Sequence, residues 1–344
     1  TTLGAEEGEI TEWVELLDFI DNNDINTPAD WVFVESRVDL DSFIDFIVSE
    51  SFANNTSWKH NREFWKAHAP GSKWRWFLPD MDRTFKLDDI DENEFDSMLR
   101  NDALLDRIKN QPKFKARLAQ RYAAHISATF NPTRIAAIVD SLGNLITPEL
   151  DRHEDRWPDS IDADQQARDL QEIKDYTTQR STSVHAEISS ELDIGTAVDM
   201  TLAVTGSGSV HLAGIPLSPG VIPIFPNLDA TLTAIPAPGF QFDSWVGISG
   251  GETTTLNTSD AIAITANFIP ASGSVVGGTL ASDTTFTLAG SPYTIDDDLI
   301  VPGGITLTVD AGVEIRVKAK RNIRVIGTLN IQGTLGSEIT LNGC

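Results

Sequence analysis

The feature that most constrains the fold is an abrupt change of composition near residue 190. Residues 1–190 hold 4 of the 24 glycines and seven of the eight tryptophans, while residues 191–344 hold the other 20 glycines. No Lys or Arg occurs between Arg180 and Arg316. Glycine is costly inside helices and common at the turns between short strands. The change therefore predicts a domain boundary, which we place around residues 192–198.

The part before this boundary is predicted to be mostly helical. Asp39 is the expected N-cap of a helix with apolar residues at helical spacing, and Pro112 is expected in the first turn of another. Asn131 and Pro132 are expected to open a third helix. Residues 163–191 form a long polar helix with a sparse apolar stripe. These elements predict a helical domain over residues 1–195.

One strand is expected within this helical part, at residues 73–78. Its alternation places Trp74, Trp76 and Leu78 on one face. Most of the four tryptophans in this region, which also include Trp58 and Trp65, are expected to fill a core, since they straddle the strand. The alternative is a platform of aromatic rings on which sugars stack.

The glycine-rich part is predicted to contain two β-domains. Residues 198–269 show short alternating runs separated by Gly, Pro, Ser and Asn, which indicates a small all-β domain. Residues 273–344 alternate strictly, with Gly312, Gly327 and Gly333 between the runs. This rhythm predicts the first coils of a parallel β-helix. Because such a solenoid buries its core only by stacking coils, we expect the protein to continue beyond this segment.

The net charge limits the classes of partner that the protein is expected to bind. The formal charge is −25 at pH 7, which argues against a nucleic-acid partner, because phosphate binding relies on Lys and Arg. A solvated acidic surface is the favoured interpretation, and recruitment of hard cations by carboxylates is the alternative. No stretch approaches the length of a membrane-spanning helix. Cys344 is the only cysteine, so an intrachain disulfide is excluded.

Candidate chemistry is concentrated after the strand. Asp80 and Asp82 follow it at positions i and i+2, and in extended backbone this spacing points both carboxylates to one side. Mg²⁺ is usually held by one or two carboxylates together with substrate phosphates. Asn61 and Arg83 flank the same segment. On chemistry alone, an acidic turn with Arg83 as its ion-pair partner is the simpler interpretation.

The residues that surround this pair resemble a known family. The run VDLDSFIDFIVSESFANN, the later pair HN and the block KWRWFLPDMDRTF are similar to the CotH kinase family, and the resemblance covers roughly residues 13–195. It implies a kinase-like fold that uses Mg²⁺ and ATP. Carried onto this sequence, the resemblance places Asp80 and Asp82 at Mg²⁺, with Arg83 beside them in the cofactor site. Asn61 becomes the second metal-binding or loop-ordering residue.

Two departures from the family pattern bear on activity. Ser57 stands at the position where the family pattern has the catalytic Asp, and a hydroxyl cannot accept the substrate proton as a carboxylate does. We also find no counterpart here of the N-terminal half of the kinase domain, which supplies the phosphate-covering loop and the ATP-binding lysine. Two hypotheses follow. One is Mg²⁺·ATP-dependent phosphorylation of a protein partner; the other is a catalytically degenerate scaffold on a cell-surface adhesion or carbohydrate-binding protein.

The glycine-rich part carries two further resemblances. The runs VTGSGSVHL, ATLTAIPAPGFQFDSWVG and ITANF are similar to the internalin-type divergent β-repeat of bacterial surface proteins. This resemblance implies a turn at Gly239 and a small core filled by Phe240, Phe242 and Trp245. Residues 273–344 resemble the start of a right-handed β-helix of secreted polysaccharide-acting enzymes and adhesins. Together these imply an exported bacterial multidomain protein outside the cell or on its surface, with a protein or surface component as partner and polysaccharide as a candidate ligand of the β-helix.

Overall fold

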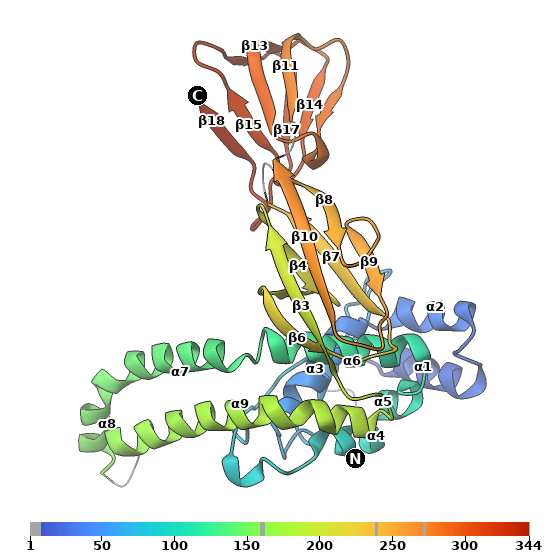
Figure 1. The fold of residues 1–344 in the computed structure, drawn as a ribbon, viewed down its shortest axis with the longest axis vertical. Helices are drawn as coiled ribbons and strands as arrows, with labels where there is room; N and C mark the ends of the chain where they lie inside the picture. The colour runs from blue at the N-terminus through green and yellow to red at the C-terminus, as the bar shows by residue number, and fades with distance from the viewer. Residues whose placement is uncertain (1–7, 159–161, 238–239, 271–272, 344) are drawn as a thin grey trace.

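The computed structural model describes residues 8–158, 162–237, 240–270 and 273–343. It confirms the predicted order of a helical part followed by a strand-rich part that ends in a β-solenoid. Figure 1 shows the first β-region rising from the helical part, with the solenoid at its far end. Cys344 and Gly239 lie outside the described residues.

The helical part is built around α3 (Leu40–Phe52), which is almost completely buried. The predicted N-caps are confirmed: Asp39 accepts a hydrogen bond from the backbone N–H of Ser42 at 3.2 Å, and Asn131 caps α7 in the same way. Pro112 stands in the first turn of α6. The other elements of this part are α1 (Thr11–Asn22), α2 (Pro28–Arg37), α4 (Glu94–Asn101), α5 (Ala103–Ile108) and α6 (Pro112–Ser127).

The expected strand forms one side of a short antiparallel hairpin. Strand β2 (Arg75–Phe77) pairs with β1 (Glu63–Trp65). Trp74 and Trp76 are buried as expected, but Leu78 is 43% exposed, because the strand ends at Phe77. Trp58 is also buried, whereas Trp65 is 49% exposed. Most of these tryptophans are therefore core residues, as expected, and Trp65 is the exception.

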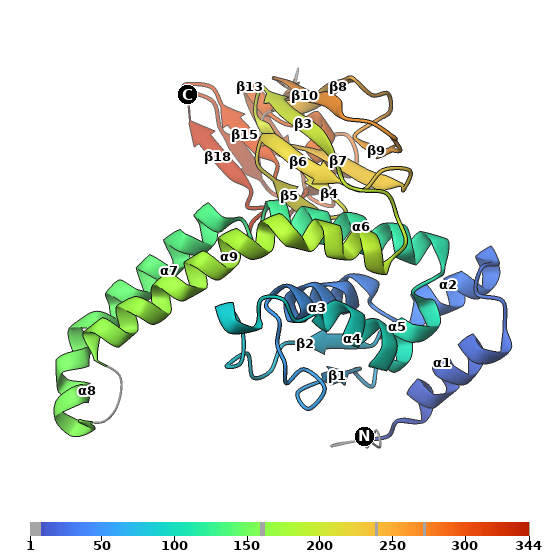
Figure 2. The same ribbon diagram turned by 60° about the horizontal axis from the view of Figure 1, so that its bottom comes forward.

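Three helices form an arm. Helices α7 (Pro132–Ile146) and α9 (Ala163–Glu191) run side by side away from the rest of the molecule, and α8 (Leu150–Arg156) lies at the tip (Figure 2). The predicted long helix is confirmed, with Tyr176, Val184 and Ile188 fully buried near its C-terminal half. The apolar side of α7 is only partly covered, since Val139 is buried but Leu142 is 54% exposed.

The first β-region contains two four-stranded sheets that share one core. One sheet has the order β6-β3-β10-β8 and the other the order β5-β4-β7-β9. Trp245 and Phe268 are buried in this core, and Gly208 lies against the Phe268 ring, where a Cβ would approach to 2.5 Å. The strands are β3 (Val198–Thr205), β4 (Gly208–Leu212), β5 (Ile215–Leu217), β6 (Gly220–Ile224), β7 (Ala230–Pro236), β8 (Phe240–Val246), β9 (Thr253–Leu256) and β10 (Ile262–Pro270).

Helix α6 docks this β-region onto the helical part. Gln120 is buried, and its side-chain amide donates to the carbonyl oxygens of Phe225 at 2.7 Å and Leu228 at 3.2 Å. Its own carbonyl accepts from the backbone N–H of Phe225 at 3.2 Å. The neighbouring Arg121 donates to the backbone carbonyl of Ala213 and pairs with Asp45 of α3. The two parts are thus joined by directional contacts to backbone groups.

The last region is a parallel β-solenoid of about three turns, as predicted. Strands stack in register, with Leu307 opposite Leu329 and Tyr293 opposite Ile315. Each coil thereby places apolar residues above those of the previous coil, and Phe286 stacks on Tyr293 with ring centroids 4.0 Å apart. The strands are β11 (Ser274–Thr279), β12 (Thr284–Phe286), β13 (Tyr293–Val301), β14 (Thr306–Val309), β15 (Glu314–Val317), β16 (Ile323–Val325), β17 (Thr328–Ile331) and β18 (Thr340–Gly343).

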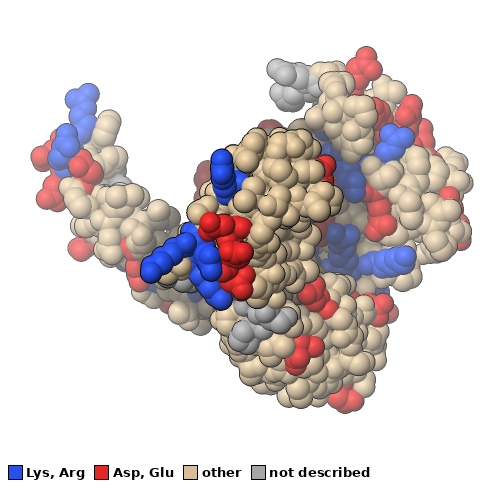
Figure 3. Space-filling model, turned by 90° about the horizontal axis from the view of Figure 1, so that it is seen from above, with Lys and Arg blue, Asp and Glu red and all other residues tan. Residues whose placement is uncertain are grey.

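The charged residues are distributed over the surface. Figure 3 shows basic side chains in separate groups with acidic side chains among them on the face seen from above. Within the described ranges, no helix is long and apolar enough to cross a membrane.

Candidate functional site

The candidate site lies in the loop that follows α3. The helix ends at Phe52, and Asn54 adopts a left-handed conformation with φ of 48°, which turns the chain away from the helix axis. Asparagine tolerates this conformation better than most residues, because its short polar side chain can bond locally. The turn brings residues 55–58 beside the segment that follows β2.

Four side chains of the two segments form a hydrogen-bonded cluster, which we call the Asn61–Asp80 cluster: Asn55, Ser57, Asn61 and Asp80. The Asn61 amide donates to the Asp80 carboxylate and to the Ser57 hydroxyl, each at 3.1 Å. The Ser57 hydroxyl in turn donates to the side-chain carbonyl of Asn55 at 2.9 Å. The structure thus brings together Ser57, Asn61 and Asp80, which the sequence placed 23 residues apart at most.

The backbone at Asp80 corrects the expectation of an extended pair. Asp80 is in the left-handed region with φ of 51°, so the chain turns there and the two carboxylates do not share one side through strand alternation. All three of Asp80, Asp82 and Arg83 are exposed, and the Asp80 carboxylate accepts a hydrogen bond from Asn61. In the described part of the chain, Arg83 has no ion-pair partner, so the structure does not support the simple acidic turn held by Arg83 either. A left-handed non-glycine residue costs free energy and is often found at functional sites.

The neighbouring Trp58 anchors the loop. Its ring is buried, and its indole N–H donates to the Glu94 carboxylate at 2.8 Å. Arg62 lies near the Trp58 ring and donates to Asp102, the N-cap of α5, at 3.0 Å. These contacts fix both ends of the segment that carries Ser57 and Asn61.

A buried polar layer that the sequence did not indicate supports the loop from beneath. Arg180 of α9 is 2% exposed and donates to the backbone carbonyl of Ser51 at 3.0 Å, and it pairs with Glu187 at 2.6 Å. The Asn54 side chain donates to the carbonyl of Asp89 at 2.9 Å. In the sequence, Arg180 belongs to a helix that is mostly polar. The one signal for its burial is that it stands four residues before Val184, and therefore on the same side of the helix as the buried apolar residues.

Glu50 is the most unusual group near the site. It is fully buried in the last turn of α3, and neither carboxyl oxygen has a hydrogen-bond partner among the described residues. Burial raises the pKa of this carboxyl to about 7, although the nearby Asn55 side chain lowers it in part, and Glu94 adds to the increase. Its backbone carbonyl accepts from the backbone N–H of Asn55, so Glu50 adjoins the loop directly.

The side chains of the Asn61–Asp80 cluster provide few of the oxygen ligands that Mg²⁺ requires. The described residues contain no group of three or more His, Cys, Asp or Glu side chains that could hold a metal ion. Mg²⁺ nevertheless often takes only one or two carboxylates and obtains its other ligands from phosphates and water. The Asp80 carboxylate and the Asn61 side chain, whose oxygen and nitrogen positions can exchange by an amide flip, supply two such groups side by side. The cluster therefore fits a magnesium·nucleotide site and does not fit a metal held by protein ligands alone.

Comparison with known protein families supports two of the resemblances, those of the helical part and of the first β-region. A family model described as CotH kinase protein matches residues 3–184, which is more than half of the chain, and the Divergent InlB B-repeat domain matches residues 224–272. No curated protein and no solved structure shows significant similarity to the chain. The second match begins after the predicted start at residue 198, and the exact domain boundaries stay predictions.

Proposed function

Because the chain belongs to the CotH kinase protein family, we propose that it is part of an exported bacterial kinase that transfers a phosphoryl group from Mg²⁺·ATP to a protein partner. The observation that carries this proposal is the contact of Asn61 with both Asp80 and Ser57 at 3.1 Å. It joins the family's loop position to its metal-binding position in one cluster.

This geometry supports the following assignment of roles to the residues. Asp80 and Asn61 would hold Mg²⁺, which neutralises charge on the phosphoryl group during transfer. Ser57 is a positioning residue, because its hydroxyl proton is donated to Asn55 while its oxygen accepts from Asn61. Asp82 and Arg83 are exposed beside the cluster, where the Arg83 guanidinium is free to contact the phosphates of ATP. Phosphoryl transfer depends mostly on positioning and charge neutralisation, so loss of a carboxylate base slows it without abolishing it.

Export and surface location are part of the same proposal. They are supported by the match to a repeat of the type found on bacterial surface proteins. The β-solenoid adds a second module, with polysaccharide as its proposed ligand. The high negative charge argues against nucleic acid as a partner.

A second function is favoured by Ser57 itself. With no carboxylate at this position, the site would bind nucleotide without transfer, and the protein would serve as a scaffold on an adhesion or carbohydrate-binding protein. The hydrogen bonds of the Ser57 hydroxyl with Asn55 and Asn61 support this alternative, because they give the side chain a structural role.

Intact-protein mass spectrometry separates the two functions. The protein, at the full length that its gene encodes, is incubated with Mg²⁺·ATP, with other copies of itself as the protein acceptor, and the kinase proposal expects mass gains of whole phosphates that Asp80→Asn abolishes. The exposed Asp91→Asn is the matched control and should leave the gain unchanged. Ser57→Asp should raise the rate about 10²-fold, as restoring a general base does. Nucleotide binding without any mass gain in the parent or in Ser57→Asp would reject the kinase in favour of the scaffold.

A further inference from the structure

A cavity lies at the end of the β1–β2 hairpin that is remote from the Asn61–Asp80 cluster. Asn61 precedes β1 and Asp80 follows β2, whereas the cavity is lined by the last residue of β1, the connecting loop and the first residue of β2. Its volume is about 710 Å³, which is in the range of small-molecule sites. The cavity is therefore separate from the proposed kinase site.

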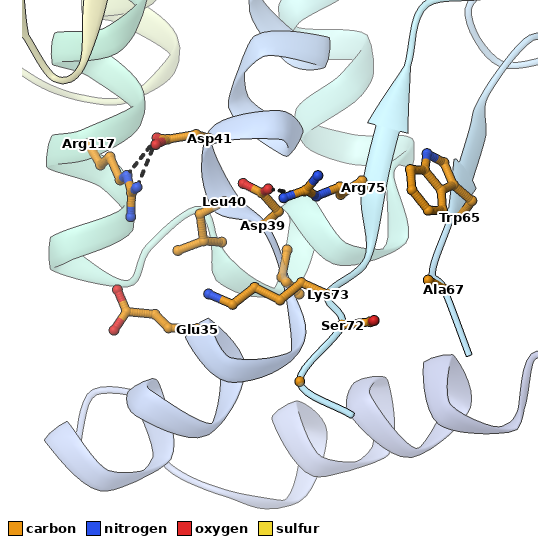
Figure 4. A pocket seen from close by; sticks show the side chains of 12 residues that line it. Glu35, Asp39, Leu40, Asp41, Trp65, Ala67, Ser72, Lys73, Arg75 and Arg117 are labelled. Atoms are coloured by element: carbon orange, nitrogen blue, oxygen red, sulfur yellow. Dashed lines mark hydrogen bonds and ion pairs between the residues drawn. The ribbon is translucent and has the colours of Figure 1, made fainter. Parts of the chain in front are cut away.

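The exposed Trp65 stands at the edge of this cavity (Figure 4). Strand alternation explains its position: Phe64 turns inward against Trp13 and Trp76, so Trp65 turns outward. Phe77 is on the same outer face of the hairpin and is 44% exposed. Two large aromatic side chains left half-exposed on one small hairpin need an explanation, since their burial would stabilise the fold.

The charges of the cavity are balanced. Arg75 pairs with Asp39 at 2.9 Å, and Arg117 pairs with Asp41 at 2.9 Å. Lys73 extends across the cavity toward Glu35 (Figure 4), and no ion pair of the described residues includes it. The lining thus has three cationic and three anionic side chains in a protein of net charge −25. Such a lining offers many hydrogen-bond donors and acceptors without net attraction for an anion or a cation.

We infer that this cavity binds a neutral oligosaccharide, with Trp65 stacked on a sugar ring and the paired charges on its hydroxyl groups. Sugar hydroxyls are uncharged donors and acceptors, and they match carboxylates and guanidinium groups that already neutralise one another. The C–H face of a pyranose ring matches the exposed indole face. Phe77, farther along the same face of the hairpin, extends the aromatic surface toward the next sugar unit.

Titration calorimetry with cellohexaose, laminarihexaose and chitohexaose tests this inference. We expect at least one of the three to bind saturably, and Trp65→Ala to weaken its binding by about tenfold or more. Phe77→Ala should weaken binding by a smaller factor. Trp157, 56% exposed on the distant arm, provides the matched control, and Trp157→Ala should leave the affinity unchanged.

Three outcomes would overturn the inference. The first is that none of the three sugars binds at about 5 mM. The second is that a sugar binds but Trp65→Ala leaves its affinity unchanged. The third is that an alternating Lys-Glu peptide binds in a Trp65-dependent way and the sugars do not. The titration uses no ATP, and Asp80→Asn should retain the parent affinity. A failure of the kinase proposal is thereby distinguishable from a failure of this one.

Discussion

The guanidinium of Arg180 lies 3.0 Å from the backbone carbonyl of Ser51, which is 129 residues earlier in the chain. This contact fastens the long helix α9 beneath the end of α3, just before the loop that carries Ser57. The same guanidinium pairs with Glu187. The geometry of the candidate site therefore depends on a charge pair that never touches it.

Replacement of this arginine should be strongly destabilising. Arg180→Met leaves the Glu187 carboxylate nearly buried without its partner, and we expect the free energy of unfolding to fall by about 3–5 kcal/mol. Urea denaturation measures the change. The double variant Arg180→Met/Glu187→Met removes both charges and should recover most of the loss. If the double variant is no more stable than the single one, the pair is not the source of the effect.

Glu50 should make stability depend on pH. Its pKa is about 7 in the folded protein against an ordinary value of 4.5. Between these two pH values the carboxyl ionises in the unfolded chain but keeps its proton in the folded protein. The contribution of Glu50 to the free energy of unfolding is therefore complete below pH 4.5 and is lost as the pH rises to about 7. Between pH 5 and pH 8, we expect the free energy of unfolding to fall by about 2–3 kcal/mol less in Glu50→Gln than in the parent. Denaturation at both pH values measures this difference, and parallel losses in the two proteins would contradict the account.

The docking of the β-region depends on Gln120. Gln120→Met keeps the size of the side chain but leaves the Phe225 N–H and two carbonyl groups without their partner, and we expect a loss of about 2–3 kcal/mol. Thermal unfolding followed by circular dichroism measures it. Gln165→Met, at an exposed position of α9, should change stability by less than about 0.5 kcal/mol. Equal effects of the two substitutions would show that the docking contact adds nothing.

The sequence predicted those features that local rules determine. Asp39, Pro112 and Asn131 mark helix starts because capping depends on a few adjacent residues. The solenoid was predictable because its alternation and glycine spacing repeat from coil to coil. The exposure of Trp65 was not, since strand alternation gives two faces but does not say which one the hairpin buries.

The site was predictable as a set of residues but not as a geometry. The family resemblance named Ser57, Asn61, Asp80, Asp82 and Arg83, and the spacing suggested that the carboxylates of Asp80 and Asp82 point to one side. The left-handed backbone of Asp80 interrupts the strand alternation on which that expectation rested, and it is stabilised by contacts between segments 25 residues apart, such as the bond from Asn55 to the Asp80 carbonyl. Long-range contacts of this kind leave no periodic signal in the sequence. The same holds for Arg180 and Gln120.

Mg²⁺-dependent ATP binding by matched aspartate variants tests the central claim most directly. Calorimetry on the full-length gene product compares Asp80→Asn with Asp82→Asn. Both carboxylates are exposed, but only that of Asp80 accepts a hydrogen bond from Asn61 among the described residues. The account expects Asp80→Asn to weaken Mg²⁺·ATP binding by about tenfold or more and Asp82→Asn to weaken it by no more than about threefold. Equal losses, or a larger loss in Asp82→Asn, would contradict the assignment of the Asn61–Asp80 cluster as the metal·nucleotide site.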